Sequence, residues 1–349
     1  MVLGSAKTRV PLQGLQCLIS VITHAPGVFT VGHLGELTQV VPFDLVDEAL
    51  ASASGLQQRV RRLPSRVVVH LLLAGAPCTG TGRTGIWSRL TASLPVPLPV
   101  PAGSSITAAM RRVGPKPLKA LFDLVKGPAA VTATQMTRFA GRLVVTIDGT
   151  QIALPDTPAN LSVFPKAKAG PNGPAGYPML RLVTLMACGT RTLMDAAFGT
   201  DATGELTYAR DLITALVRLY RERWEIETSY CELKSTVLGG RVPRGRHPAA
   251  ATQETRALLV AYQALHTAMS DAVPHRPDID PDRAAFTITL NTARDQIIRA
   301  TGIIHTRTDL VGQIGTAILN GLPPARRDRS RPRVKSRGPW RRTADRRTV

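Results

Sequence analysis

Three β-rich runs stand close together in the middle of this chain, and helical patterns surround them. Residues 142–150 (RLVVTIDGT), 179–189 (MLRLVTLMACG) and 191–199 (RTLMDAAFG) are rich in β-branched and large apolar side chains and are bounded by glycine. The segments before residue 128 and after residue 205 instead repeat apolar residues every three or four positions. Strands followed by helices predict an α/β or α+β core, behind an N-terminal helical unit.

The helical patterns carry stop signals at their ends. Residues 43–55 end in Gly55, and residues 118–127 end in Gly127 followed by a proline. Residues 66–76 (RVVVHLLLAGA) fit a buried helix or a strand, because periodicity does not separate the two. Further helices are expected at 252–271 and at 281–300.

The charge of the chain indicates which class of molecule it binds. The net charge is +20 and the isoelectric point is about 11.0, which favours a polyanionic partner, most commonly nucleic acid. Residues 325–349 hold eleven Lys or Arg and two acids, so a disordered tail that orders on phosphate is expected. The alternative is a solvated, solubilising terminus. Two further basic clusters, Arg59–Arg62 and Arg111–Arg112, fit a DNA-reading face or an ordinary solvated one.

The four cysteines are dispersed and show no metal-ligand spacing, so neither zinc nor a disulfide framework is expected. A reducing cytoplasm fits, with association with the nucleoid. Residues 12–22 weakly resemble a signal peptide but are interpreted as an amphipathic or buried segment. Residues 67–76 are too short to cross a bilayer, so no membrane partner is expected.

One predicted helix carries an unusual set of polar side chains. Residues 220–234 (YRERWEIETSYCELK) place four of them at helical spacing on one face: Tyr220, Arg223, Glu227 and Lys234. Beside that face runs an apolar stripe of Leu219, Ile226, Tyr230, Leu233 and Val237, which is suited to packing on a sheet. The alternative is a surface helix with an ordinary Arg223–Glu227 ion pair. Asp148, at the end of the first β-rich run, is weak evidence alone, because an Asp-Gly pair can simply form a turn.

These residues resemble a known family. The spacing Y-x2-R-x3-E-x6-K of residues 220–234 is similar to the motif of DDE transposases of the insertion-sequence-4 family. Residues 144–164 (VVTIDGTQIALPDTPANLSVF) resemble the segment around that family's first catalytic Asp, which would be Asp148. Residues 28–50, 59–74 and 109–129 resemble its N-terminal domain and the linker into its core.

The resemblance implies an RNase H-like core, a mixed sheet flanked by helices, that cleaves and joins DNA at insertion-sequence ends. Asp148 and Glu227 would hold Mg²⁺ or Mn²⁺, and Tyr220, Arg223 and Lys234 would face the DNA. The family uses two ions to activate the attacking oxygen and to stabilise the leaving one. Element ends and target DNA are the implied partners, and a homodimer is an open option.

The sequence departs from the family pattern at the second catalytic Asp, which is not found. Asp148 and Glu227 are 79 residues apart, and no insertion domain separates them. We interpret this as an internal deletion in a decayed copy. Asp201 is the doubtful substitute for the missing acid, ahead of Asp195 and Asp211. The alternative function is a catalytically inactive DNA-binding protein that uses the helical domain and the tail; the 4% aromatic content argues against a third option, RNA binding.

The expected organisation has four parts. Residues 1–24 form an N-terminal segment, and residues 25–128 form the helical N-terminal domain. Residues 140–322 form the core, without an insertion domain, and residues 323–349 form the basic tail.

Overall fold

The protein is described by a computed structural model that covers residues 34–35, 37–53, 63–92, 98–127, 138–139, 142–166, 176–213, 223–272, 284–299 and 312–322. Several features singled out in the sequence lie outside these residues. They are the N-terminal segment 1–24, the basic cluster Arg59–Arg62, Leu219, Tyr220 and the tail 323–349.

The N-terminal part is helical, as predicted. Its helices are α2 (Leu37–Val40), α3 (Phe43–Ser52), α4 (Ser65–Gly75), α5 (Arg83–Thr91), α6 (Gly103–Val113) and α7 (Lys116–Val125). Pro42 and Pro64 immediately precede α3 and α4, where the missing proline N–H costs no helical hydrogen bond. The ambiguous residues 66–76 fall in α4, whose residues are almost all buried. A helix buried on all sides has no polar face, which is why periodicity could not identify it.

The three β-rich runs form one antiparallel sheet. Strands β3 (Val145–Ala153), β4 (Met179–Ala187) and β5 (Leu193–Thr200) pair in the order β3-β4-β5. A small hairpin of β1 (Arg138–Phe139) and β2 (Arg142–Leu143) precedes them, and helix α8 (Pro158–Leu161) lies between β3 and β4. The mixed sheet expected from the family resemblance is not seen in the described part of the chain, where every strand pair is antiparallel. Consecutive strands need only short connections to pair in this way.

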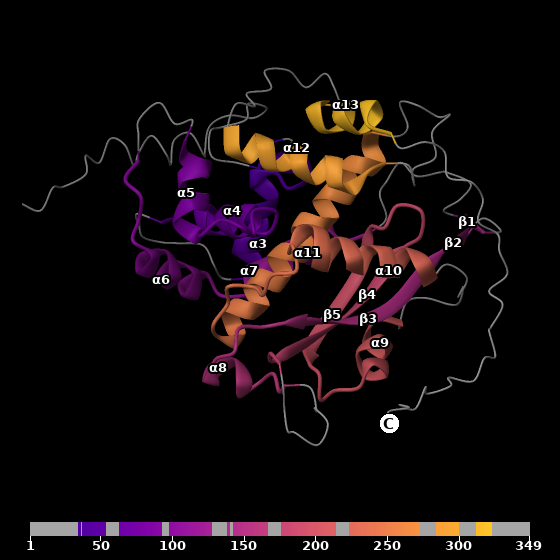
Figure 1. Ribbon diagram of the computed structural model, residues 1–349, viewed down its shortest axis with the longest axis horizontal. Helices are drawn as coiled ribbons and strands as arrows, with labels where there is room; N and C mark the ends of the chain where they lie inside the picture. The colour runs from indigo at the N-terminus through magenta and orange to yellow at the C-terminus, as the bar shows by residue number, and fades with distance from the viewer. Residues whose placement is uncertain are drawn as a thin grey trace, which may run out of the picture.

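Helices cover both faces of this sheet (Figure 1). Helix α9 (Glu205–Ile213) packs Ala209 and Leu212 against Val183 and Leu185 on one face. The opposite face belongs to the main core and meets helix α10 (Arg223–Cys231) and its continuation η2 (Glu232–Val237), a π-helical turn. The two faces follow from strand alternation, because successive residues of β3 point to opposite sides.

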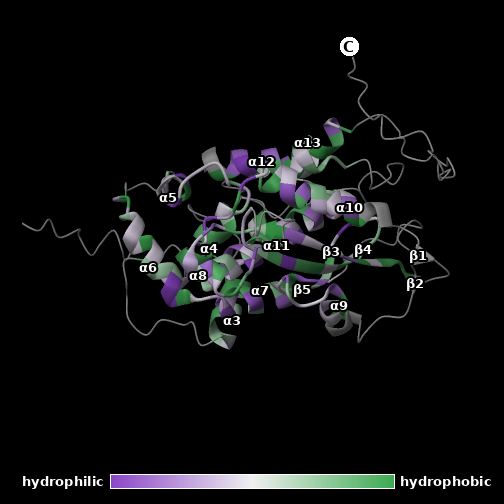
Figure 2. Cartoon of the chain, turned by 60° about the horizontal axis from the view of Figure 1, so that its bottom comes forward, coloured by the Kyte–Doolittle hydropathy of each residue, from purple (hydrophilic) through white to green (hydrophobic). Residues whose placement is uncertain are grey.

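The main core centres on helix α11 (Pro248–Ala272), with α12 (Phe286–Arg299) and α13 (Gly312–Asn320) beside it. The predicted helix at 252–271 is thus confirmed, and the one predicted at 281–300 is confirmed for residues 286–299. Buried residues of α11 join the N-terminal helices and the sheet in one cluster. Figure 2 shows hydrophobic residues along α11 and the strands, in the middle of the molecule. Over the residues with described structure, no helix is both long and apolar enough to span a bilayer.

Candidate functional site

Helix α10 and η2 form one continuous element whose inner side is apolar. The buried residues on that side are Ile226, Tyr230, Leu233 and Val237. They belong to the stripe that the sequence predicted to pack on a sheet, so that prediction is confirmed for the described residues. Glu227 and Lys234, by contrast, are exposed at the margin of the element.

Tyr230 fastens this element to the sheet. Its hydroxyl donates a hydrogen bond to the backbone carbonyl of Asp148 and lies 2.9 Å from Oγ1 of Thr184. Because the hydroxyl has only one hydrogen, Thr184 donates to it. Burial raises the pKa of the Tyr230 phenol well above its ordinary value, and the nearby charge of Asp148 acts in the same direction. Tyr230 therefore remains neutral and acts as an anchor.

Asp148 lies on the face of the sheet that meets α10. It pairs in register with Thr184, whose hydroxyl contacts Tyr230, and opposed residues of an antiparallel pair share a face. The Asp148 carboxylate accepts a hydrogen bond of 2.9 Å from the backbone N–H of Gly149 and is half-buried.

Lys234 makes the next contact along the same strand. Its Nζ donates to Oγ1 of Thr150 over 3.3 Å. Tyr230 and Lys234 are about 6 Å apart along a helix axis, and Asp148 and Thr150 are about 6.6 Å apart along a strand. The helix and the strand therefore run side by side in the same direction. Glu227, three residues before Tyr230, lies on the other side of this anchor from Lys234.

The structure thus brings Asp148, Glu227 and Lys234 to one side of the sheet. The side chain of Arg223, at the start of α10, lies outside the described part, as does all of Tyr220. The geometry of these two motif residues therefore stays a prediction.

Asp201 is directed elsewhere. Its Oδ1 accepts hydrogen bonds of 2.8 Å from Nε2 of Gln151 and of 2.8 Å from Nε of Arg181. Gln151 and Arg181 face each other across β3 and β4, on the side opposite Asp148. Arg181 also pairs with Glu205 at 3.3 Å, at the start of α9. The structure does not bring Asp201 to Asp148.

The other two candidate acids do not join the site either. The Asp195 carboxylate pairs with Nζ of Lys126 at 2.9 Å, and Asp195 lies in register with Leu185 on the α9 side. The side chain of Asp211 lies outside the described part. Throughout the described ranges, no group of three or more His, Cys, Asp or Glu side chains is arranged to hold a metal ion.

A buried carboxylate network supports η2, and periodicity did not reveal it. Glu232 accepts hydrogen bonds from Nε2 of His266 at 3.1 Å and from the hydroxyl of Tyr262 at 2.9 Å, and pairs with Arg191 at 3.2 Å. Burial would raise the pKa of Glu232, but the charges and hydrogen bonds of its neighbours hold that pKa below the ordinary value. The network fixes the turn between Glu227 and Lys234.

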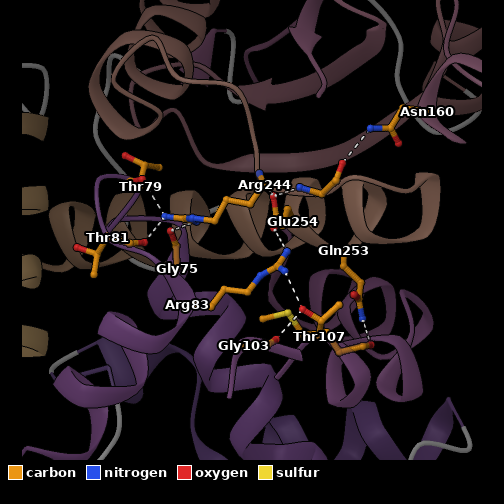
Figure 3. Close-up of polar contacts among 12 residues, drawn as sticks. Gly75, Thr79, Thr81, Arg83, Gly103, Thr107, Asn160, Arg244, Gln253 and Glu254 are labelled. Atoms are coloured by element: carbon orange, nitrogen blue, oxygen red, sulfur yellow. Dashed lines mark hydrogen bonds and ion pairs between the residues drawn. The ribbon is translucent and has the colours of Figure 1, made fainter. Parts of the chain in front are cut away.

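A second polar network joins the N-terminal helices to the core (Figure 3). Glu254 of α11 pairs through Oε1 with Arg83 of α5 at 3.0 Å. Its Oε2 accepts from the backbone N–H groups of Arg244 and Gly245. The Arg244 guanidinium donates to carbonyls of the turn after α4, including those of Thr79 and Thr81 at 2.8 Å each.

Part of this chain is similar to known transposases. Residues 31–123, which hold helices α2 to α7, match the family model "Insertion element 4 transposase N-terminal". The chain is also 31% identical over 170 residues to the transposase InsG for insertion sequence element IS4 of Escherichia coli (strain K12). These matches support an insertion-sequence-4-type transposase. A further relative is InsZ of the same strain, whose name marks it as a candidate transposase, at 25% identity over 176 residues.

These alignments are partial. The first alignment covers 49% of this chain and 38% of InsG, and the second covers 50% of this chain and 58% of InsZ. The matched part is therefore less than two thirds of either relative. No solved structure matches this chain significantly.

Proposed function

We propose that this chain binds the DNA ends of an insertion sequence and that Asp148 and Glu227 are the remaining carboxylates of its strand-transfer site. The contact that supports this most directly is the hydrogen bond from Tyr230 to the Asp148 carbonyl. It seats the motif helix on the strand that carries Asp148. Asp148 and Glu227 are 79 positions apart in the sequence, so without this contact nothing would indicate that they act together.

The donor set suits one divalent cation. Asp148 is half-buried beside a neutral phenol, and Glu227 is exposed on the adjoining helix. Carboxylate oxygens are the ligands that Mg²⁺ and Mn²⁺ prefer, with water completing the shell. Such a cation, when bound, activates the attacking oxygen and stabilises the leaving oxygen at a scissile phosphate.

Cationic and phenolic side chains would then position the DNA. Lys234 is exposed beside Thr150 and can contact a phosphate next to the cation. We propose that Arg223 and Tyr220, which precede it in the motif, contact the same strand.

Within the described residues, no third carboxylate lies beside Asp148 to hold a second cation. Asp201 is held by Arg181 and Gln151 on the other side of the sheet, so it does not supply a third ligand beside Asp148. Strand β3 also forms one edge of the described sheet. We infer an RNase H-like core that lacks a strand and an acid through an internal deletion. The consequence is a transposase copy that binds DNA and one cation but transfers strands poorly.

Manganese binding tests the carboxylate pair. Titration of the full chain with Mn²⁺, followed by electron paramagnetic resonance, is expected to show one weak site. Asp148→Asn and Glu227→Gln should each abolish it. Asp201→Asn is the matched control and should leave it unchanged. Binding that survives Glu227→Gln, or that is lost in Asp201→Asn, would contradict the proposed site.

A further inference from the structure

A pocket that is open to solvent lies where the N-terminal helices meet the core. Its walls come from α4 and α5, from the segment after η2 and from α11. Ile152 of β3 also lines it. The polar side chains that line it are Thr79, Arg83, Arg241, Arg244, Glu254 and Thr255.

Hydrogen-bond donors in this pocket have no acceptor. The Nε of Arg83 and the hydroxyl of Thr255 are buried without a hydrogen-bond partner. Thr255 as a whole is 1% exposed. A buried donor without a partner destabilises the folded state, so each such atom calls for an explanation. Arg83 and Thr255 both line the same cavity, so one acceptor-rich ligand that entered it could approach both residues.

The charges around the pocket are unbalanced. Three arginines line it, and Glu254 is the only acid among the lining residues. Both oxygens of Glu254 are already used, by Arg83 and by backbone N–H groups. Burial lowers the pKa of Arg244. The charge of Glu254 raises this pKa, and the charges of Arg83 and Arg241 lower it. A bound anion would relieve this repulsion.

The arginines differ in how firmly they are held. Arg244 and Arg83 are fixed by the network that joins the two parts of the chain. Arg241 is exposed, and its guanidinium lies over Gly80, with one terminal nitrogen 3.7 Å from where a Cβ would stand. Gly80 has no side chain to cover this guanidinium. A planar guanidinium beside a fixed cationic wall is well suited to bind a phosphate with two parallel hydrogen bonds.

The pocket also lies in line with the proposed strand-transfer site. Asp148, Thr150 and Ile152 alternate onto one face of β3; Lys234 contacts Thr150, and Ile152 lines the pocket. Four strand residues span about 13 Å, which corresponds to roughly four nucleotide steps of 3.4 Å in a B-form strand. A DNA strand at Asp148 would therefore reach the pocket after passing Lys234.

We propose that this pocket binds a backbone phosphate of the DNA strand whose neighbouring phosphates lie at Asp148 and Lys234. The proposal rests on the proposed function for its DNA partner. The choice of a phosphate as the ligand rests on the residues of the pocket alone. A free phosphate ion would satisfy the same donors, so the experiment has one arm for each source.

The first arm uses inorganic phosphate with the full chain at constant ionic strength. Phosphate at ten times its dissociation constant should raise the melting temperature by about 3 °C. Arg241→Gln should remove most of this shift, and so should Thr255→Val. The control is Lys116→Gln, an exposed lysine of α7 outside the pocket, which should keep the shift. Equal shifts in wild type and Arg241→Gln would overturn the proposal, whether or not Thr255→Val folds.

The second arm measures duplex DNA binding as a function of salt. Arg241→Gln should reduce the slope of log K against log salt concentration by about one, and Lys116→Gln should leave it unchanged. A phosphate shift that depends on Arg241, together with an unchanged DNA slope, would assign the pocket to free phosphate and overturn the DNA part. Loss of Mn²⁺ binding is measured separately, so failure of the carboxylate site would not be mistaken for failure of this pocket.

Discussion

The hydroxyl of Tyr230 donates a hydrogen bond to the backbone carbonyl of Asp148 and in turn accepts one from Thr184 at 2.9 Å. One side chain thereby joins the motif helix to both strands at the level of the candidate acid. Tyr230 is 7% exposed and Thr184 is fully buried, so water does not replace these bonds.

Tyr230→Phe should destabilise the protein by about 1–3 kcal/mol, because it leaves the Thr184 hydroxyl and the Asp148 carbonyl without their partner. It should also weaken Mn²⁺ binding, since Asp148 loses its fixed position relative to Glu227. Urea unfolding and Mn²⁺ titration check the two effects. Tyr208→Phe is the matched control: that hydroxyl donates to the Thr200 carbonyl at 3.1 Å and is half-buried, on the α9 side. Equal losses of Mn²⁺ affinity in both variants would contradict the anchoring role.

Glu254→Gln should cost about 3 kcal/mol of stability, because removing one partner of a largely buried ion pair leaves Arg83 uncompensated. The side chains of Arg83 and Glu254 are only 21% and 15% exposed. Urea unfolding measures the cost. For comparison, Lys119→Gln breaks an exposed pair with Asp123 and should change stability by less than about 0.5 kcal/mol. Similar losses of stability in the two variants would mean that the Glu254 network does not stabilise the contact between the N-terminal helices and the core.

The pKa of Glu232 predicts a pH dependence of stability. Because this pKa is lowered in the folded protein, the folded state holds its proton less tightly than the unfolded state. The stabilisation is therefore fully present above the ordinary glutamate pKa of about 4.3 and is lost as the pH falls through the folded value.

Glu232→Gln tests this dependence. The variant should be less stable than wild type at pH 7, and the difference should shrink as the pH falls below about 4.3. Unfolding free energies from pH 3 to pH 7 check it. The control is Asp123→Asn. Asp123 forms an exposed ion pair with Lys119, and its pKa is also lowered. The difference in unfolding free energy between this variant and wild type should be smaller. A gap between wild type and Glu232→Gln that stays constant with pH would contradict the ionised network.

The sequence predicted most elements of this fold, and particular residues show where it stopped. Local patterns were sufficient for α3, α7, α11 and the three strands, since apolar spacing and glycine stops are short-range signals. The buried stripe of the motif helix was also predictable. Glu232 was not, because its partners Arg191, Tyr262 and His266 lie 30 to 41 residues away in the sequence.

Asp201 illustrates a second limit. Its position in a loop made it a candidate for the missing acid. In the structure its partner is Arg181, and strand register determines that contact, because Arg181 lies opposite Gly199 on β5 and opposite Gln151 on β3. Such cross-strand relations are tertiary and carry no short-range signal. The Arg83–Glu254 pair joins residues 171 apart and was equally invisible.

The basic tail predicts a salt-dependent affinity for DNA. Residues 325–349 hold eleven Lys or Arg, and each phosphate that they neutralise releases counterions. Deleting these residues should flatten the salt dependence of duplex binding markedly. Fluorescence anisotropy with a labelled duplex across a salt series measures it. An unchanged slope would locate the DNA-binding charge elsewhere in the chain, for example at Lys234, at Arg241 or in the cluster Arg59–Arg62.

Strand joining is the sharpest test of the incomplete site. Strand transfer with two metal ions needs a further carboxylate besides Asp148 and Glu227. Asp201 does not supply it, because Arg181 holds it on the opposite side of the sheet. Supercoiled DNA that carries the element ends, incubated with the full chain and Mg²⁺ or Mn²⁺, should therefore yield no joined product. Joining that disappears in Asp201→Asn would name Asp201 as the acid and show that the loop after β5 rearranges on DNA. Joining that persists in Asp201→Asn, Asp195→Asn and Asp211→Asn, tested one at a time, would mean that the second carboxylate comes from another part of the chain.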